Sequence, residues 1–199
     1  EKYLLNSYNL SFENYNDLWK WSIADLNVFW SSIADYFGMR FFDHPETIIN
    51  SRNIMDTKWF EGAKVNFSDQ MLNNRRVIAD KEAFLCVSET FGRSSLTWRE
   101  LSEKISSVAI SMQKMGIKKG DRVACILPNS EKALIAFLAA ASLGAIWSLC
   151  SLDMGYASVI DRFKQIKPKL LIAQAGYVHG GRFIDRRENI QKIKRGLKS

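Results

Sequence analysis

Arg182 follows a histidine and two glycines, His179, Gly180 and Gly181, and lies at the start of a basic part of the chain that could form a surface for phosphates or another anion. The guanidinium of Arg182 can hold two phosphate oxygens at once, because its N–H groups form a planar fork. A neutral His179 can donate one hydrogen bond, although it adds little charge at pH 7. The two glycines would let a ligand approach the backbone. The alternative is a mobile glycine loop beside a solvated arginine, and the residue types leave both open.

The segment around and after this run is basic, in a chain of 199 residues with a formal net charge of +7. From Arg182 onward, only Asp185 and Glu188 oppose the positive side chains. Such an excess of positive charge forms either a solvated helix face or a surface that binds phosphates or another anion, such as a nucleotide. We expect no nucleic-acid partner, because the tail has no recognisable nucleic-acid motif and no interleaved aromatic residues. The basic residues are Arg182, Arg186, Arg187, Lys192, Lys194, Arg195 and Lys198.

The elements that must position these residues are centred on a strand–helix–strand pattern in the middle of the chain. Val123–Leu127 is a short apolar run between a polar turn and a proline, which is typical of a buried strand. Ser130 can cap the helix that follows, and Gly144 can end it in a left-handed conformation. Ala145–Leu149 predicts a second strand and Lys169–Ala173 a third. Strands joined in this way are parallel, so the sequence predicts an α/β fold with a mostly parallel sheet flanked by helices.

Local signals predict further elements on either side of this pattern. Thr97 and Glu100 have the spacing of a capping box, and Gly116 can end the helix that begins there. Two short runs of strand-forming residues before Thr97 predict a hairpin. The three glycines of residues 176–181 predict a loop.

The first seventy residues are interpreted as packing elements without chemistry. Residues 1–15 are polar with scattered aromatic residues and predict a loosely held lead-in. Ser22 or Asp25 can begin a helix that carries a wide apolar, largely aromatic stripe. Residues 39–58 predict a surface loop, and Ser68 can cap the helix that comes after it.

The cysteines and histidines favour an intracellular protein without a zinc site. Cys86, Cys125 and Cys150 are odd in number and have no CxxC spacing, so we expect them to be reduced, as in the cytoplasm. His44 and His179 lie far apart in the sequence, and no metal site is expected. We also expect no membrane partner, because there is no signal-peptide pattern and no apolar run long enough to span a bilayer.

A long stretch of the chain resembles a known family of enzymes. The matching segments are LTWREL, MGIKKGDRV, PNSEKALIAFLAAASLGAIWS and DRFKQIKPKLL. They resemble the early part of the adenylate-forming acyl-CoA synthetases, and within that family the branch that activates acetoacetate, through Trp147, Asp153–Gly155 and Asp161–Ile166. The resemblance implies a helical cap segment over residues 1–70. It also implies that residues 71–199 are the first part of an AMP-binding (adenylation) domain, incomplete at its C-terminus.

The resemblance implies an enzyme that joins acetoacetate to AMP, releases pyrophosphate and then lets the thiol of coenzyme A attack the acyl-adenylate. Such an enzyme needs ATP, Mg²⁺ and coenzyme A, with amides and cations that spread the developing charge. In the family this work falls to a Ser/Thr/Gly-rich loop ending in Lys and to a later lysine. The sequence contains no such loop and no GxxxxGK[ST] motif. We therefore expect a leading fragment that is inactive alone, and we name no catalytic residue.

The same resemblance implies a binding site for the nucleotide end of coenzyme A. In the acetyl-CoA synthetase relatives, a loop after the third strand carries two arginines spaced by two residues that help to bind it. Arg182 matches the second of these arginines, and His179 stands in the place of the first. The predicted cofactor-binding residues are therefore His179, Gly180, Gly181 and Arg182.

Three alternatives remain at this stage. The acid could be acetate, propionate or another short acid, because the residues of the acyl pocket are not in this sequence. The chain could instead be a non-catalytic module that binds an anion or a partner protein through its basic tail. A nicotinamide-binding domain is disfavoured, because the turn Pro128-Asn129-Ser130 lacks the glycines that a pyrophosphate requires. A fragment would also expose apolar surface where further strands should pack, which predicts self-association.

Overall fold

The computed structural model describes residues 2–51, 53–73, 78–89 and 92–197. The chain divides into two compact units, residues 1–65 and residues 66–199, and each is described by itself. None of the helices in these ranges combines the length and the apolar character that a membrane crossing requires.

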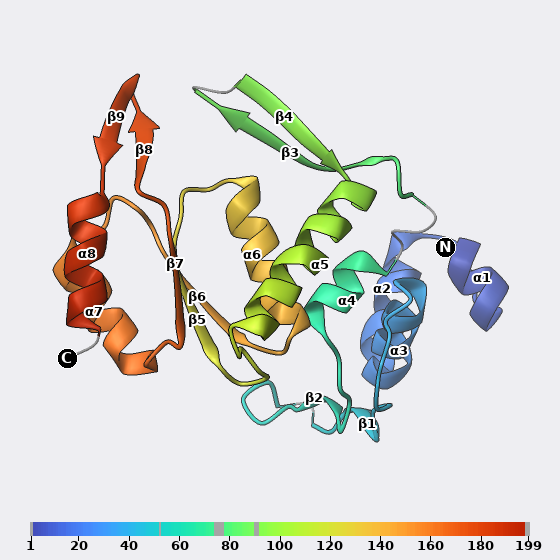
Figure 1. Ribbon diagram of the computed structural model, residues 1–199. Helices are drawn as coiled ribbons and strands as arrows, with labels where there is room; N and C mark the ends of the chain where they lie inside the picture. The colour runs from blue at the N-terminus through green and yellow to red at the C-terminus, as the bar shows by residue number, and fades with distance from the viewer. Residues whose placement is uncertain (1, 52, 74–77, 90–91, 198–199) are drawn as a thin grey trace. The chain divides into compact units, whose positions relative to one another are not determined.

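The first unit is helical, with one short pair of strands. The contact between Trp30 and Trp59, with ring centroids 5.0 Å apart, links the last helix to the second strand, and Trp21 packs on Phe29 in the same edge-to-face way. The aromatic stripe is therefore packing, as predicted. The elements are α1 (Lys2–Tyr8), α2 (Tyr15–Ala24), α3 (Leu26–Tyr36), β1 (Thr47–Ile49) and β2 (Trp59–Glu61), and the two strands are antiparallel (Figure 1).

Two predicted irregular segments of this unit contain regular elements, and the predicted cap of α3 is confirmed. The lead-in of residues 1–15 contains helix α1, and the predicted loop of residues 39–58 contains strand β1. Helix α1 has only seven residues and none of them is fully buried, so its half-buried Tyr3, Leu4 and Tyr8 leave too short a pattern to reveal a helix. Asp25 caps α3, because its carboxylate accepts hydrogen bonds from the backbone amides of Asn27 and Val28.

The second unit is an α/β layer structure around a parallel sheet, as predicted. Its central strand is β5 (Arg122–Ile126), with β6 (Ile146–Cys150) on one side and β7 (Leu170–Ala173) on the other, both parallel to it. The other elements are α4 (Phe67–Leu72), β3 (Glu82–Ser88), β4 (Gly92–Thr97), α5 (Trp98–Lys114), α6 (Glu131–Ser142), α7 (Tyr156–Ile166), β8 (Gly176–His179), β9 (Arg182–Asp185) and α8 (Arg187–Gly196).

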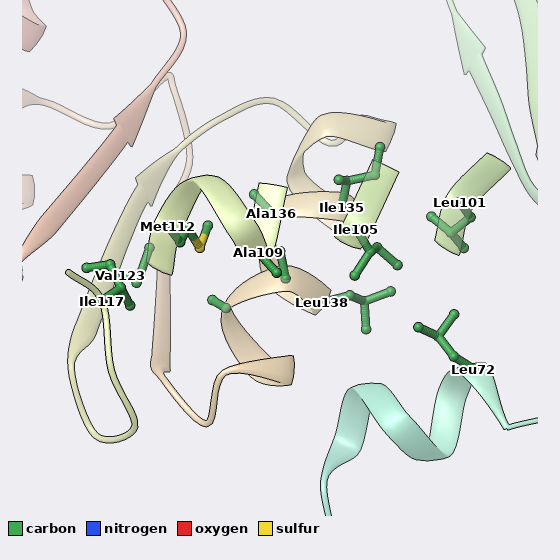
Figure 2. Packing of buried hydrophobic residues seen from close by; sticks show 12 residues of the cluster. Leu72, Leu101, Ile105, Ala109, Met112, Ile117, Val123, Ile135, Ala136 and Leu138 are labelled. Carbon is green, nitrogen blue, oxygen red and sulfur yellow. The ribbon is translucent and has the colours of Figure 1, made fainter. Parts of the chain in front are cut away.

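Helices cover both faces of this sheet (Figure 1). Val123 of β5 packs against α5 and α6, together with Ile105 and Leu138, in the cluster that Figure 2 shows. Its neighbour Ala124 packs on the opposite face, against Phe163 of α7. Successive residues of a strand point to opposite faces, so one continuous apolar run supplies the core on both sides.

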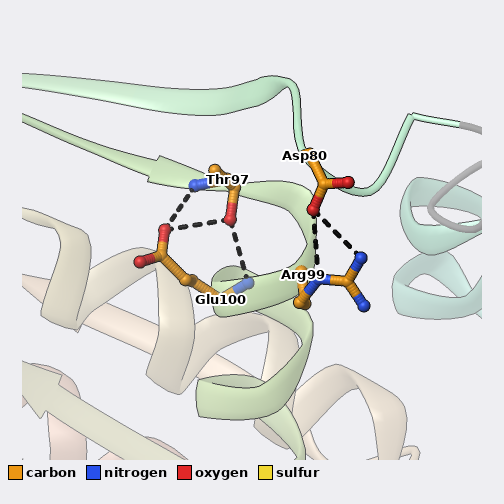
Figure 3. A network of polar contacts seen from close by, with 4 residues as sticks. All are labelled: Asp80, Thr97, Arg99 and Glu100. Carbon is orange, nitrogen blue, oxygen red and sulfur yellow. Dashed lines mark hydrogen bonds and ion pairs between the residues drawn. The ribbon is translucent and has the colours of Figure 1, made fainter.

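Helix α5 begins and ends as its sequence predicts. The side chain of Thr97 accepts a hydrogen bond from the backbone N–H of Glu100, and the Glu100 carboxylate accepts one from the N–H of Thr97 at 2.8 Å, which completes the capping box (Figure 3). At the other end, Gly116 has a φ of +83°, and the amide of Ile117 donates to the carbonyl of Met112 at 3.0 Å. This is a Schellman motif.

Two predicted caps are not made by the expected side chains. Ser130 precedes α6 but makes no capping hydrogen bond, and its hydroxyl is buried without a partner. At α4, Asn66 is the capping residue and accepts from the amide of Asp69 at 3.1 Å, whereas Ser68 lies inside the helix and is buried. Gly144 ends α6 with a φ of +68°, as predicted.

The three cysteines are free, and two of them lie in the parallel sheet. Cys125 of β5 is buried, and its burial raises the pKa of the thiol to about 12, with a smaller contribution from Cys150. Burial also raises the pKa of Cys150 of β6. Cys86 of β3 is half-buried. The prediction of reduced cysteines is thus consistent with the structure.

Candidate functional site

The four candidate site residues form the tip of a hairpin rather than a loop. Strands β8 and β9 are antiparallel, with His179 opposite Arg182, so only Gly180 and Gly181 make the turn. Their φ angles are +56° and +73°. A two-residue turn with both φ angles positive is the type that matches the twist of a hairpin, and Gly-Gly is one of its sequence signals. The loop predicted over residues 176–181 is therefore wrong at residues 176–179, which form β8, and right at Gly180 and Gly181.

The hairpin brings the four residues together on an exposed surface. His179 and Arg182 flank the turn and are both solvent-exposed. A methyl group built on Gly180 or Gly181 would meet no atom within 4 Å. The turn conformation therefore explains the two glycines, since neither position is crowded by a neighbouring atom.

A cavity of about 400 Å³ lies beside this hairpin. Asn129, which follows β5, and Ser151 and Asp153, which follow β6, line it together with Tyr177 and His179 of β8. The cavity is thus at the carboxyl ends of the parallel strands, where open α/β sheets bind their ligands. Among the predicted residues only His179 lines it. The others were missed by sequence reasoning, although their positions directly after buried strands are a usable signal.

Two charged groups near the cavity, Asp153 and Arg186, are held by hydrogen bonds to neutral groups. A hydrogen bond from the Ser151 hydroxyl and bonds from backbone amides hold the pKa of Asp153 below its usual value, with a smaller contribution from the charge of Arg186. Arg186 also donates a hydrogen bond to the carbonyl of Met154.

The basic tail is also paired in part. Arg187 binds the carboxylate of Asp185 at 2.6 Å and, chiefly through that contact, lowers the pKa of Asp185 to about 2. Lys192 binds Glu188 at 2.8 Å on the surface of α8. Lys198 lies outside the described residues. Within the described ranges, no group of three or more metal-binding side chains gathers.

Comparisons with known proteins place the chain in a family. The family model for AMP-binding enzymes matches residues 73–198, and the model for the acetyl-coenzyme A synthetase N-terminus matches residues 15–71. Acetoacetyl-CoA synthetases of Macaca fascicularis and Rhizobium meliloti are 38% and 32% identical to this chain, and each match covers 94% of it. A malonamoyl-CoA synthetase of Penicillium aethiopicum is 34% identical over 88% of the chain.

A solved structure of the same kind of enzyme as these relatives also matches the chain. The acetoacetyl-CoA synthetase from Streptomyces lividans matches 99% of this chain with a TM-score of 0.89 and 32% sequence identity. The chain covers 31% of that structure and 25–28% of the three relatives named above, so it spans less than a third of the length of the proteins that it matches. The matched family model alone covers well over half of the chain. The chain belongs to the family of AMP-binding enzymes.

Proposed function

We propose that this chain is part of an ATP-dependent acid–thiol ligase that joins acetoacetate to coenzyme A through an acyl-adenylate. The observation that carries the proposal is the match to acetoacetyl-CoA synthetases over 94% of the chain at up to 38% identity. The matched structure supports it with the same fold over nearly the whole chain. The proposed substrates are acetoacetate, ATP and coenzyme A, and Mg²⁺ would accompany ATP as it does in phosphoryl-transfer sites.

We further propose that the β8–β9 hairpin holds the nucleotide end of coenzyme A. Arg182 and His179 are exposed hydrogen-bond donors that flank an open turn, and this donor set suits phosphate. The adjacent cavity of about 400 Å³ falls in the size range of small-molecule sites. Asp153 in its wall would favour the donor groups of a base over a second phosphate.

The domain boundaries, location and self-association are also proposals. We place a cap segment at residues 1–70 and the first part of the adenylation domain at 71–199, which is supported by family matches that meet between residues 71 and 73. A cytoplasmic location is supported by the three free cysteines. Self-association is supported by Ile146 and Leu149, which are about half exposed on the edge strand β6.

The first test is pyrophosphate exchange by the whole protein that contains this chain. We expect acetoacetate to drive exchange of labelled pyrophosphate into ATP, and acetate or propionate to drive it at least about tenfold more slowly, which corresponds to a difference of about 1.4 kcal/mol in transition-state binding. Faster exchange with acetate than with acetoacetate would mean that the substrate is a different short acid. A purified, folded protein that shows no exchange with any of the three acids would favour the non-catalytic binding module.

The second test concerns the hairpin. We expect Arg182→Ala to raise the KM for coenzyme A about tenfold or more, because a lost hydrogen bond from a charged group costs about 1.5–3 kcal/mol. Arg187→Ala is the matched control, since Arg187 is held by Asp185 at the other end of β9 and its loss should leave the KM within about twofold. Steady-state kinetics of thioester formation measure both. An unchanged KM in Arg182→Ala would remove the hairpin from the coenzyme A site.

A further inference from the structure

An acidic side chain from a distant part of the second unit lies on the turn of the β8–β9 hairpin. The carboxylate of Glu89 accepts a hydrogen bond from the backbone N–H of Gly180, with 3.1 Å between oxygen and nitrogen. Glu89 directly follows β3, ninety-one residues earlier in the chain. The β3–β4 and β8–β9 hairpins are thus linked at their ends (Figure 1).

This contact uses a donor that the turn would otherwise offer to an anion. In a two-residue hairpin turn, the N–H of the first turn residue is outside the ladder of hydrogen bonds between the strands. The N–H of Gly180 belongs to the peptide bond that joins it to His179, and Arg182 stands across the turn. A phosphate bound by these two side chains would therefore meet the Gly180 amide and the Glu89 carboxylate together.

The contact is weak enough to be displaced. Glu89 and Gly180 are both exposed, so solvent screens the charge of the carboxylate and reduces the strength of the bond. A phosphate carries more negative charge and can accept from Arg182, His179 and the amide at once. The carboxylate would repel this phosphate for as long as it stays on the turn.

We propose that Glu89 is an internal competitor of the phosphate: it occupies the Gly180 amide in the empty site and must leave when a nucleotide phosphate binds. This inference rests on the proposed coenzyme A site and assigns that site a residue outside the hairpin. Glu89 thereby lowers the affinity for phosphate and keeps the turn ordered when no ligand is bound.

The test compares two charge-removing variants of the same hairpin. Glu89→Gln keeps the shape and a hydrogen-bond acceptor but removes the charge. Glu82→Gln, at the other end of β3, makes the same change in net charge away from the turn. The probe is adenosine 3′,5′-bisphosphate, titrated calorimetrically into the whole protein that contains this chain, at about 20 mM and about 300 mM NaCl. We expect Glu89→Gln to bind about three- to tenfold more tightly at low salt, with a smaller gain at high salt, and Glu82→Gln to change affinity less than twofold.

The outcomes separate this proposal from the one on which it rests. Equal or weaker binding by Glu89→Gln, with wild-type binding that Arg182→Ala abolishes, would overturn the competitor role and leave the coenzyme A site intact. Absence of binding in the wild type and in every variant would overturn both. Equal gains in both glutamine variants would mean that only net charge matters, and would also overturn the competitor role. A ¹⁵N-glycine spectrum gives a second readout, since the Gly180 amide signal should shift in Glu89→Gln alone.

Discussion

Replacing Ile105 by alanine is expected to lower the free energy of unfolding by about 3 kcal/mol, because removing a buried Ile side chain loses burial and leaves a cavity. Ile105 is 2% exposed and lies in the cluster between α5, α6 and the sheet (Figure 2). Its neighbours Leu138 and Leu101 are held by two different helices and cannot both move into the space. Urea denaturation followed by circular dichroism measures the change.

The same helix offers the matched control. Ile110 is 51% exposed on α5, five residues further along, so Ile110→Ala is the same chemical change without burial. We expect it to alter the free energy of unfolding by less than about 0.5 kcal/mol, because alanine also has the better helix propensity. Equal decreases in the free energy of unfolding for Ile105→Ala and Ile110→Ala would contradict the orientation of α5 toward the sheet.

Gly176→Ala is expected to cost about 2–3 kcal/mol and to displace the candidate site. A Cβ at Gly176 would lie 2.5 Å from the backbone oxygen of Ile184 and 2.5 Å from the ring of Phe183, both on β9. A ring can rotate, but the backbone oxygen belongs to the partner strand and can move only if the hairpin opens. The variant should therefore also lose affinity for adenosine 3′,5′-bisphosphate by about tenfold, as measured by calorimetry.

Gly155→Ala tests whether steric crowding of the added Cβ causes the loss of stability expected for Gly176→Ala. Gly155 precedes α7 with a φ of −62°, and a Cβ there would meet no atom within 4 Å. Any residue can adopt this backbone conformation, so we expect a change of less than about 1 kcal/mol and unaltered binding. If Gly176→Ala were equally mild, the hairpin would have to be looser than its close strand pairing indicates.

The central part of the fold could be predicted from the sequence because its signals are local and agree with one another. The strand expected over Val123–Leu127 is observed at Arg122–Ile126, and both ends of α5 carry their motifs within a few residues. The elements that were missed have no such signal. Strand β1 has three residues and α1 has seven, so both are too short to leave a clear periodic pattern.

Only the candidate-site residues that are adjacent in the sequence could be predicted from it. His179 to Arg182 are adjacent in sequence, and the resemblance to the coenzyme A loop of the acetyl-CoA synthetase relatives pointed to them. Asn129 and Asp153 come from loops after two different strands and meet at the cavity only because β5 and β6 are parallel neighbours. Glu89 reaches the turn from a separate hairpin, through one hydrogen bond to the backbone N–H of Gly180. Such residues become predictable once it is known which strands and hairpins are neighbours in space, and patterns within single segments do not specify those neighbours.

The buried thiols of the sheet have a practical consequence for chemistry on this protein. A thiol with a pKa of about 12 is ionised in only roughly one molecule in a hundred thousand at pH 7, so Cys125 should resist alkylating reagents and peroxide while the sheet is intact. Cys150 is also buried, with a raised pKa. Half-buried Cys86 is left as the position for a single fluorescent label, on the same strand that leads to Glu89. A dye attached there would report on the contact between the two hairpins without an engineered cysteine.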